Sequence, residues 1–336
     1  MTKPLVEVRD LGVTYTLAKG ELNAVSDVGL VLNRGEALGL VGESGCGKST
    51  LARAMLRMLP NNAQLAEQSR ILFDGNELTE MSDERFRREV RWKRIAMVFQ
   101  SAMNSLNPVT TVGKQIVDLI RLHRAGVNSA DARSLCRELL QSVSLPPEVA
   151  DRFPHELSGG MRQRAIIAMS LVADPDVLVA DEATTALDVV VQAQILAELA
   201  DMRRERGLAL LVVSHDMDVI AQVCDRVAVM YAGQIVETGP TSEVLANPAH
   251  PYTIGLLAAL PRLHGPRRRL ATLGGAPPEL IGTALDECLF APRCPIVAGQ
   301  CTDRQPTLGE PSLGRQCRCY FPFDQRLRAE RSVESS

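Results

Sequence analysis

The chain has 336 residues, enough for two domains of ordinary size, and 46% of them are hydrophobic and 23% charged, as in globular proteins. Thirty-seven Lys and Arg against 40 Asp and Glu leave a net charge of −3, which gives no basic excess to hold nucleic acid or anionic lipid. The longest apolar runs, residues 165–173 and 208–213, are too short to cross a bilayer, and the first residues lack the apolar core of a signal peptide. We therefore expect a cytoplasmic protein.

Short apolar runs bounded by glycine alternate with longer helical patterns. The predicted strands are residues 5–8, 37–41, 177–180, 208–213 and 227–230. Strands that are apolar throughout and separated by helices predict an α/β fold with a parallel sheet. Residues 188–206 repeat apolar side chains at helical spacing and stop at Gly207, so we expect a helix packed on that sheet.

The pattern changes twice along the chain. From about residue 84 to 165 helical patterns dominate, with a helix opening at Ser129 and Asp131, which predicts a helical subdomain inside a domain of residues 1–260. Residues 261–283 have the Pro and Gly content of a linker. We expect residues 284–327 to form a small Cys-rich module and residues 328–336 to be a disordered tail.

Residues 42–49, Gly-Glu-Ser-Gly-Cys-Gly-Lys-Ser, match the phosphate-binding pattern G-x4-G-K-[ST] between a predicted strand and a predicted helix. Glycines let successive backbone N–H groups face one concavity, Lys48 reaches the β- and γ-phosphates, and the Ser49 hydroxyl ligates Mg²⁺. A Gly-rich turn without function is the alternative. The predicted ATP-binding residues are Gly42, Ser44, Gly45, Cys46, Gly47, Lys48, Ser49 and Thr50.

Two further patterns suggest phosphate chemistry. Asp181 and Glu182 follow an apolar strand, which brings their carboxylates to the sheet edge where a phosphate loop also lies. There Asp181 would hold Mg²⁺, and Glu182 would act as general base. Alone, such a pair more often only begins a loop. Residues 157–164, Leu-Ser-Gly-Gly-Met-Arg-Gln-Arg, open a helix whose N-terminus could bind an anion, although an ordinary Ser cap is the alternative.

Together these motifs resemble those of an ABC transporter ATPase over about residues 3–260. The resemblance is carried, in the family's order and spacing, by the phosphate loop, Gln100 in Val-Phe-Gln-Ser, residues 157–164, Asp181-Glu182, Ala186-Leu187-Asp188, and His215 in Val-Ser-His-Asp. It implies a P-loop NTPase domain with a helical subdomain, and hydrolysis of ATP. The Cys-rich C-terminal module would be an addition to this fold.

A narrower resemblance is to the ATPase subunits of dipeptide, oligopeptide and nickel importers. It is carried by residues 99–108, 181–188 and 250–257 and by the C-terminal cysteines. One departure is Ala183, where that family usually has Pro. Because Ala brings no chemistry of its own, we expect ATPase activity to survive. The resemblance implies import of peptides or a related solute at the cytoplasmic face of the inner membrane. The implied partners are a second, paralogous ATPase subunit, two permease subunits and an extracytoplasmic solute-binding protein, with no nucleic acid.

The resemblance also implies roles for single residues. Tyr15 would stack on adenine, although a Tyr in a strand pattern is otherwise a sheet residue. Gln100 would sense Mg²⁺ and γ-phosphate, and His215 would contact γ-phosphate. The remaining implied contacts lie at the dimer interface, where Ser158, Gly159 and Gly160 would touch ATP held by the opposite subunit and Asp188 would shape the interface.

Two rival functions are an ABC ATPase that works on nucleic acid or the ribosome and the ATPase subunit of an exporter. A single cassette and the net charge of −3 favour the importer over the first rival. Co-purification with permease subunits, rather than with ribosomes or DNA, would separate these alternatives.

Five of the eight cysteines, Cys288, Cys294, Cys301, Cys317 and Cys319, lie within 32 residues. In a reducing compartment such clustering favours a metal site over disulfides. The spacing lacks the paired C-x2-C knuckles of most structural zinc sites, whereas four thiolates on a loop-rich segment can hold a [4Fe–4S] cluster. Zinc and a metal-free module are the alternatives. By resemblance to the importer ATPases, the ligands would be Cys288, Cys294, Cys301 and Cys319, with Cys317 as the substitute for the last.

Overall fold

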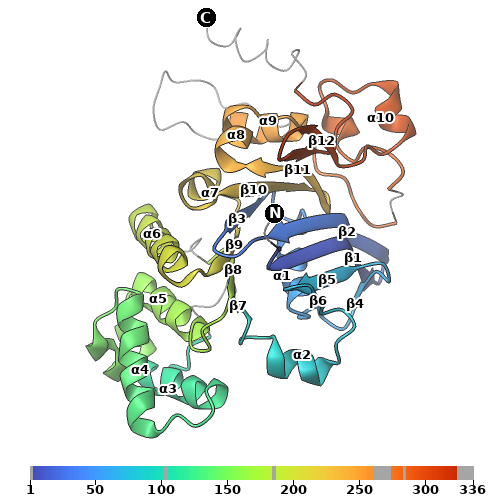
Figure 1. The fold of residues 1–336 in the computed structure, drawn as a ribbon. Helices are drawn as coiled ribbons and strands as arrows, with labels where there is room; N and C mark the ends of the chain where they lie inside the picture. Colours follow the sequence, from blue (N-terminus) through green and yellow to red (C-terminus); the bar gives the residue numbers. More distant parts are fainter. Residues whose placement is uncertain (1–2, 101–104, 184–186, 260–273, 283–284, 324–336) are drawn as a thin grey trace, which may run out of the picture. The chain divides into compact units, whose positions relative to one another are not determined.

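The computed structural model describes residues 3–100, 105–183, 187–259, 274–282 and 285–323. Its contacts divide the chain into two compact units that interleave along the sequence (Figure 1). The first comprises Met1–Val6, Leu32–Ala37 and Leu72–Val213, and the second Glu7–Val31, Leu38–Ile71 and Ser214–Ser336. These boundaries cut across the predicted domain of residues 1–260. Ala186, most of the predicted linker and the predicted tail lie outside the described residues.

Strands and helices follow one another along the described chain. The strands are β1 (Val6–Leu17), β2 (Gly20–Leu32), β3 (Ala37–Val41), β4 (Ala63–Leu65), β5 (Arg70–Phe73), β6 (Asn76–Glu77), β7 (Ile95–Val98), β8 (Val177–Asp181), β9 (Ala209–Val213), β10 (Arg226–Tyr231), β11 (Gln234–Pro240), β12 (Gly309–Ser312) and β13 (Arg315–Cys317). The α-helices are α1 (Lys48–Met55), α2 (Asp83–Glu89), α3 (Val112–His123), α4 (Ser129–Ser142), α5 (Gly159–Ser170), α6 (Val189–Arg206), α7 (Met217–Val223), α8 (Thr241–Ala246), α9 (Pro251–Ala258) and α10 (Gly299–Asp303). Short 3₁₀ helices are η2 (Pro147–Asp151), η3 (Pro154–Glu156) and η4 (Ala291–Arg293). None of these helices has both the length and the apolar character needed to cross a bilayer.

The first unit contains three parallel strands, β7, β8 and β9, with Val98 beside Ala180 and Ala180 beside Val212. Every residue of β8 and β9 is buried, as the apolar runs predict for strands covered on both faces. Strand β7 falls inside the stretch predicted to be helical, and in this detail the prediction is wrong. Its four residues are too few to show a strand period that differs from a helix turn.

Helices α3, α4 and α5 of the first unit pack on one another (Figure 1). In α3 the residues Val112, Ile116 and Ile120 recur every four positions and are fully buried. The helix predicted to open at Ser129 is present as α4, but its cap is Asn128, whose side chain accepts the N–H groups of residues 130 and 131. The helix predicted at residues 188–206 is also present, as α6, and ends at Gly207 with φ 66°.

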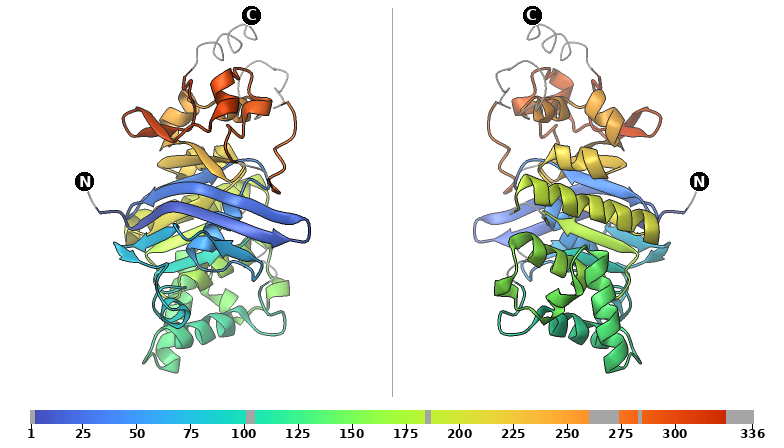
Figure 2. Two further views of the ribbon diagram at one scale, coloured as in Figure 1. Left: turned by 90° about the vertical axis from the view of Figure 1, so that its right-hand side faces the viewer. Right: turned by 90° about the vertical axis from the view of Figure 1, so that its left-hand side faces the viewer.

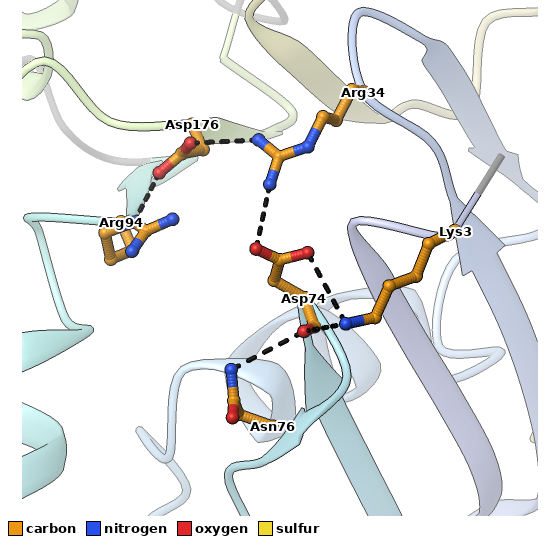
Figure 3. Close-up of polar contacts among 6 residues, drawn as sticks. All are labelled: Lys3, Arg34, Asp74, Asn76, Arg94 and Asp176. Atoms are coloured by element: carbon orange, nitrogen blue, oxygen red, sulfur yellow. Dashed lines mark hydrogen bonds and ion pairs between the residues drawn. The ribbon is translucent and has the colours of Figure 1, made fainter.

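A chain of ion pairs braces the first unit where its strands begin (Figure 3). Asp176 lies just before β8, and Arg94 lies just before β7. The Asp176 carboxylate accepts from Arg34 Nη1 at 3.4 Å and from Arg94 Nε at 2.5 Å. Arg34 also pairs with Asp74 at 3.1 Å, and Lys3 donates to the Asp74 carbonyl at 2.6 Å. Because β7 and β8 run parallel, this network marks their amino ends, and their carboxyl ends carry the predicted site residues.

In the second unit β1 and β2 form a long pair joined by a turn at residues 18–19 (Figure 2), and β1 pairs on its other side with β4. Strand β3 lies parallel to β10, which continues antiparallel into β11. Strand β13 then pairs with β11, and β12 with β13.

The C-terminal segment, residues 285–323, therefore belongs to the second unit and extends its sheet. The prediction of a separate small module is not supported, because β13 covers the backbone groups that β11 would otherwise expose as an edge strand. A second attachment is Phe290, which is 2% exposed and packs edge-on against Tyr231, with ring centroids 5.2 Å apart.

Candidate functional site

The predicted phosphate loop connects β3 to α1 in the second unit, and its glycines are needed for its shape. Gly42, Gly45 and Gly47 have φ values of 153°, 81° and 106°, a region that side chains with a Cβ rarely adopt. A Cβ on Gly42 would lie 2.1 Å from the Met230 carbonyl oxygen, and one on Gly47 would lie 2.4 Å from that of Ala24. The loop thus combines a buried strand, left-handed glycines and a helix N-terminus, the arrangement that binds phosphate groups.

Lys48 opens α1, and its ammonium group turns back into the loop. Nζ donates to the carbonyl oxygens of Gly42 and Glu43 at 2.8 and 2.9 Å, and the residue is only 5% exposed. The Sγ atom of Cys46 lies 3.6 Å from Nζ. Burial raises the pKa of the Cys46 thiol although the Lys48 charge opposes this, so the thiol is protonated at neutral pH. Two backbone oxygens of the loop therefore hold the Lys48 ammonium group.

Tyr15, on β1, lies beside the first turn of α1. Its hydroxyl is 3.3 Å from the Thr50 hydroxyl, and its ring is partly exposed. The structure thus brings the predicted adenine-stacking residue next to the predicted phosphate loop within one unit. His215, also in the second unit, comes two residues after the end of β9 and is exposed.

In the first unit, Gln100 and the two acidic residues share one sheet edge. Asp181 ends β8 and is 1% exposed. Because Val98 lies beside Ala180, Gln100 and Glu182 each come two residues beyond paired positions, and the Gln100 side chain donates to Glu182 Oε2 at 2.6 Å. Glu182 has φ 47°, and its N–H donates to the Val213 carbonyl. The prediction that Asp181 and Glu182 lie at the carboxyl edge of the sheet agrees with this geometry, whereas the contact of Glu182 with Gln100 was not predicted.

The motif of residues 157–164 forms the start of α5, also in the first unit. Ser158 is exposed and caps the helix by accepting the N–H of Met161 at 3.3 Å. Asp188 caps α6 in the same way, accepting from the Val191 N–H at 2.9 Å. The two helix starts are packed closely, since a Cβ on Gly160 would lie 2.5 Å from the Val191 side chain. The small residues therefore let α5 begin against α6 with Ser158 facing solvent.

The predicted ATP-site residues are thus divided between the two units. Residues of the second unit are Tyr15, Gly42, Ser44, Gly45, Cys46, Gly47, Lys48, Ser49, Thr50 and His215. Residues of the first unit are Gln100, Ser158, Gly159, Gly160, Asp181, Glu182 and Asp188. Each group is assembled within its own unit as described above.

All eight cysteines lie in the described part of the chain, and none is paired in a disulfide. Cys288, Cys294, Cys301 and Cys319 line one pocket together with His250 and Phe290. Cys317 does not line it; it lies in β13, where it pairs with Glu237 of β11. Burial raises the pKa of Cys319 to about 12.

The pocket does not have the geometry of a metal site. Within the described residues, no group of three or more His, Cys, Asp or Glu side chains is arranged to hold a metal ion. The [4Fe–4S] cluster expected from the sequence is therefore not supported by the positions of these side chains.

Sequence reasoning missed one contact of the phosphate loop. Glu43, a variable position of the motif, forms an ion pair with Arg293 of the C-terminal segment, 250 residues further along the chain. No local spacing indicates a pair so distant. The signal available in the sequence was only that both residues are charged and that each neighbours a predicted site.

Two family models match the chain. Residues 25–185 match the model described as "ABC transporter", and residues 236–301 match "Oligopeptide/dipeptide transporter, C-terminal region". The second match includes Arg293, Cys288, Cys294 and Cys301 and ends before Cys319.

Curated relatives match almost the whole chain. A probable peptide ABC transporter ATP-binding protein, y4tR of Sinorhizobium fredii, is 43% identical over 94% of both chains. The oligopeptide transport ATP-binding protein OppD of Salmonella typhimurium is 42% identical over 96% of this chain and 95% of its own. A probable D,D-dipeptide transport ATP-binding protein, DdpD of Escherichia coli, is 40% identical over 96% and 98%.

Solved structures resemble the cassette part of the chain. The dimeric ATP-binding cassette MJ0796, bound to ADP and phosphate, covers 70% of this chain with 98% of its own length at 26% identity and a TM-score of 0.62. The protein cbiO1 of Clostridium perfringens, described as part of the ABC transporter complex cbiONQ, matches 73% of this chain and 92% of its own length, at 27% identity and a TM-score of 0.63.

Proposed function

Since the chain belongs to the family of ABC transporter ATP-binding proteins and is an ATP-hydrolysing subunit that powers peptide import, we propose that residues 42–50, with Tyr15, form its ATP-binding site. The observation that carries this assignment is the loop itself. Three left-handed glycines shape the loop, and the Lys48 ammonium group is hydrogen-bonded to its backbone. Tyr15 lies against Thr50 in the first turn of α1, the helix that follows the loop. Phosphate groups would bind the loop N–H groups and Lys48, and adenine would stack on Tyr15.

The hydrolytic groups are the residues at the carboxyl ends of β7 and β8. By resemblance to the family, the Mg²⁺ ligands would be Ser49, Gln100 and Asp181, whose hydroxyl, amide and carboxylate oxygens are the hard donors that fit this ion. Mg²⁺ would neutralise charge that develops on the phosphates. Glu182 acts as general base toward water, oriented by the hydrogen bond from Gln100, and His215 contacts the γ-phosphate.

The active form is a dimer with a second, paralogous ATPase subunit. The support for this is the start of α5, where Ser158 is exposed and the two glycines after it are half-buried, so that Ser158 is available to ATP bound by the opposite subunit. Asp188 shapes the same interface from the neighbouring helix start. The similar MJ0796 cassette is described as dimeric.

Two permease subunits and an extracytoplasmic solute-binding protein complete the transporter, with this chain at the cytoplasmic face of the inner membrane. ABC ATP-binding subunits of peptide importers work with membrane permeases, and the first unit exposes three apolar side chains, Val109, Leu122 and Phe153, that could contact them. Peptides or a related small solute are the cargo. No nucleic acid takes part.

If the chain binds a [4Fe–4S] cluster, the four-cysteine pocket is where it would bind, although the side chains of this structure are not arranged around a metal. The support is that Cys288, Cys294, Cys301 and Cys319 all line it while Cys317 does not. When bound, such a cluster can exchange one electron. Anaerobically purified protein should then be brown, with near-equal amounts of iron and sulfide. Colourless protein with one bound zinc, or with no metal, would refute the cluster but would not affect the assignment as an ATPase.

The test of the ATP site is Lys48→Ala, which removes the cation of the phosphate loop. We expect the purified chain to lose most of its affinity for ATP and the assembled transporter to lose peptide import. Lys114→Ala, in α3 of the first unit, is the control for removal of one Lys. Unchanged ATP affinity of Lys48→Ala would refute the proposed site, and co-purification with ribosomes in place of permeases would refute the transporter partners.

A further inference from the structure

The C-terminal segment reaches the phosphate loop through one arginine. Both terminal nitrogens of Arg293 donate to the Glu43 carboxylate, Nη1 to Oε2 at 2.9 Å and Nη2 to Oε1 at 3.0 Å. The Arg293 side chain is 4% exposed and is fixed further by donation from Nε to the Gly274 carbonyl at 2.9 Å. Such a two-point pair fixes direction as well as distance, because both planar groups must lie edge to edge. The hydrogen bonds with Glu43 raise the pKa of Arg293, which is permanently charged.

Glu43 in turn holds the loop and Lys48. Its carbonyl oxygen accepts from Lys48 Nζ at 2.9 Å and from the Cys46 N–H at 3.3 Å. Its own N–H donates to the Tyr252 hydroxyl at 3.0 Å. The residue clamped by Arg293 therefore also supplies one of the two backbone oxygens that position the Lys48 ammonium group.

The C-terminal segment also reaches Glu43 indirectly, through Tyr252, whose hydroxyl accepts the Glu43 N–H. Phe290 packs against Tyr252, with centroids 5.6 Å apart, and against Tyr231. Tyr231 and Tyr252 are themselves in contact, with centroids 4.6 Å apart, and the Arg293 guanidinium lies 5.6 Å from the Tyr231 ring centroid. Residues 290–293 thus fix Glu43 from both its carboxylate and its backbone N–H.

We propose that Arg293 is a positioning residue of the nucleotide site, through which the C-terminal segment sets the geometry of the phosphate loop and hence its affinity for ATP. The proposal rests on the proposed role of residues 42–50 as the ATP site. It gives the segment a function in nucleotide binding that is independent of whether the cysteines carry a metal.

The alternative is that Arg293 only attaches the segment to the rest of the second unit. Another arginine allows these roles to be separated. Arg318 is 5% exposed at its side chain and pairs with Asp27 at 2.8 Å, also donating to the Ile235 carbonyl. It attaches the same segment to the same unit but makes no contact with the phosphate loop, so Arg318→Gln is the matched control for Arg293→Gln.

The experiment measures equilibrium binding of Mg-ATP to the full chain, with thermal unfolding recorded for every variant. Arg293→Gln should weaken ATP binding by roughly fivefold, as expected for a neighbour coupled to the site, and Arg318→Gln should bind ATP as the parent does. Glu43→Gln should weaken binding by a similar factor, and the double variant should be no weaker than either single variant, because both remove the same pair. The exchanged pair, Glu43→Arg with Arg293→Glu, should regain part of the loss.

Several results would overturn the proposal. Parent-like affinity in Arg293→Gln would do so, as would equal losses in Arg293→Gln and Arg318→Gln, which would show attachment only. If Arg293→Gln folds, additive losses in the double variant would refute coupling. If Arg293→Gln does not fold, Glu43→Gln decides, since it breaks the pair from the partly exposed side, and parent-like ATP affinity in Glu43→Gln would then refute the proposal. These outcomes are distinct from failure of the proposed function, which Lys48→Ala tests separately.

Discussion

Glu182 is held in a backbone conformation that few residues other than glycine adopt. Its φ of 47° persists because the N–H donates to the Val213 carbonyl and the side chain accepts from Gln100. A left-handed glutamate costs energy that the surrounding contacts must offset, and such positions cluster at functional sites. The strain fixes the direction of one carboxylate at the end of β8, as a general base requires.

Glu182→Gln should keep ATP binding and remove the base. The amide retains the size of the side chain and can still accept from Gln100, so hydrolysis by the assembled transporter should fall by about 10² to 10⁴. Steady-state ATPase rates and ATP binding measure the two effects separately. A parent rate of hydrolysis would place the base elsewhere.

The control is Asp176→Asn, which removes a carboxylate from the other end of the same strand. It weakens the ion pairs to Arg34 and Arg94 (Figure 3) and should lower the free energy of unfolding by about 0.5 to 1 kcal/mol. The rate of ATP hydrolysis should not change, because this network lies at the amino ends of the strands.

At the residue scale, the sequence was sufficient where a motif placed chemistry at the end of a strand. Asp181 and Glu182 could be expected at the carboxyl edge because they follow an apolar strand, whereas the contact of Glu182 with Gln100 depends on β7, which was not predicted. The Arg293 to Glu43 pair could not be foreseen, since it joins residues 250 positions apart in the chain and depends on aromatic packing at Phe290. Likewise, four of the five clustered cysteines share a pocket, but the positions of their side chains could not be read from their spacing.

At the element scale, helices α5 and α6 begin side by side, each capped by its own polar side chain. Ser158 and Asp188 accept N–H groups of the first turns, and the close approach of Val191 leaves room only for glycine at position 160. The start of α5 can therefore present Ser158 to another molecule without rearrangement of its own unit.

Ser158→Arg should leave ATP binding by the purified chain unchanged but abolish ATP-dependent pairing with the second ATPase subunit. The Arg side chain would project from an exposed helix start into the space where the partner's ATP must dock. Gel filtration with ATP and the partner subunit measures pairing, and Ser158→Ala isolates loss of the cap, which should cost about 1 kcal/mol of stability and little pairing. Equal loss of ATP binding by the purified chain would count against this role.

Elements were predictable where their period extended over several turns or where all residues were apolar. Strands β3 and β8 and helix α6 follow their predicted bounds closely. Strand β7 has four residues and β13 three, too few to show a period, and β13 contains the charged Arg315. Both are stabilised by pairing with a neighbouring strand, which is a property of the tertiary structure and not of local sequence.

At the scale of the whole molecule, exposed apolar side chains occur in both units. Permease docking on the first unit can therefore be tested by comparing apolar positions there with a highly exposed apolar position in the second unit. Val109 and Leu122, in the first unit, are 80% and 74% exposed, whereas Leu313, in the C-terminal segment, is 96% exposed. Single exposed apolar side chains are common on protein surfaces, so experiment must decide which of these positions contacts a permease.

We expect the permease to dock on residues 100–157 of the first unit. A photoreactive amino acid placed at Val109 or Leu122 should cross-link to a permease subunit in the assembled transporter, and one placed at Leu313 should not. Val109→Asp combined with Leu122→Asp should leave ATP binding unchanged but reduce peptide import, because burying two carboxylates against an apolar permease surface costs several kcal/mol. Cross-links from Leu313 alone would move the docking site to the C-terminal segment, and full import by the double Asp variant would exclude both side chains from the contact.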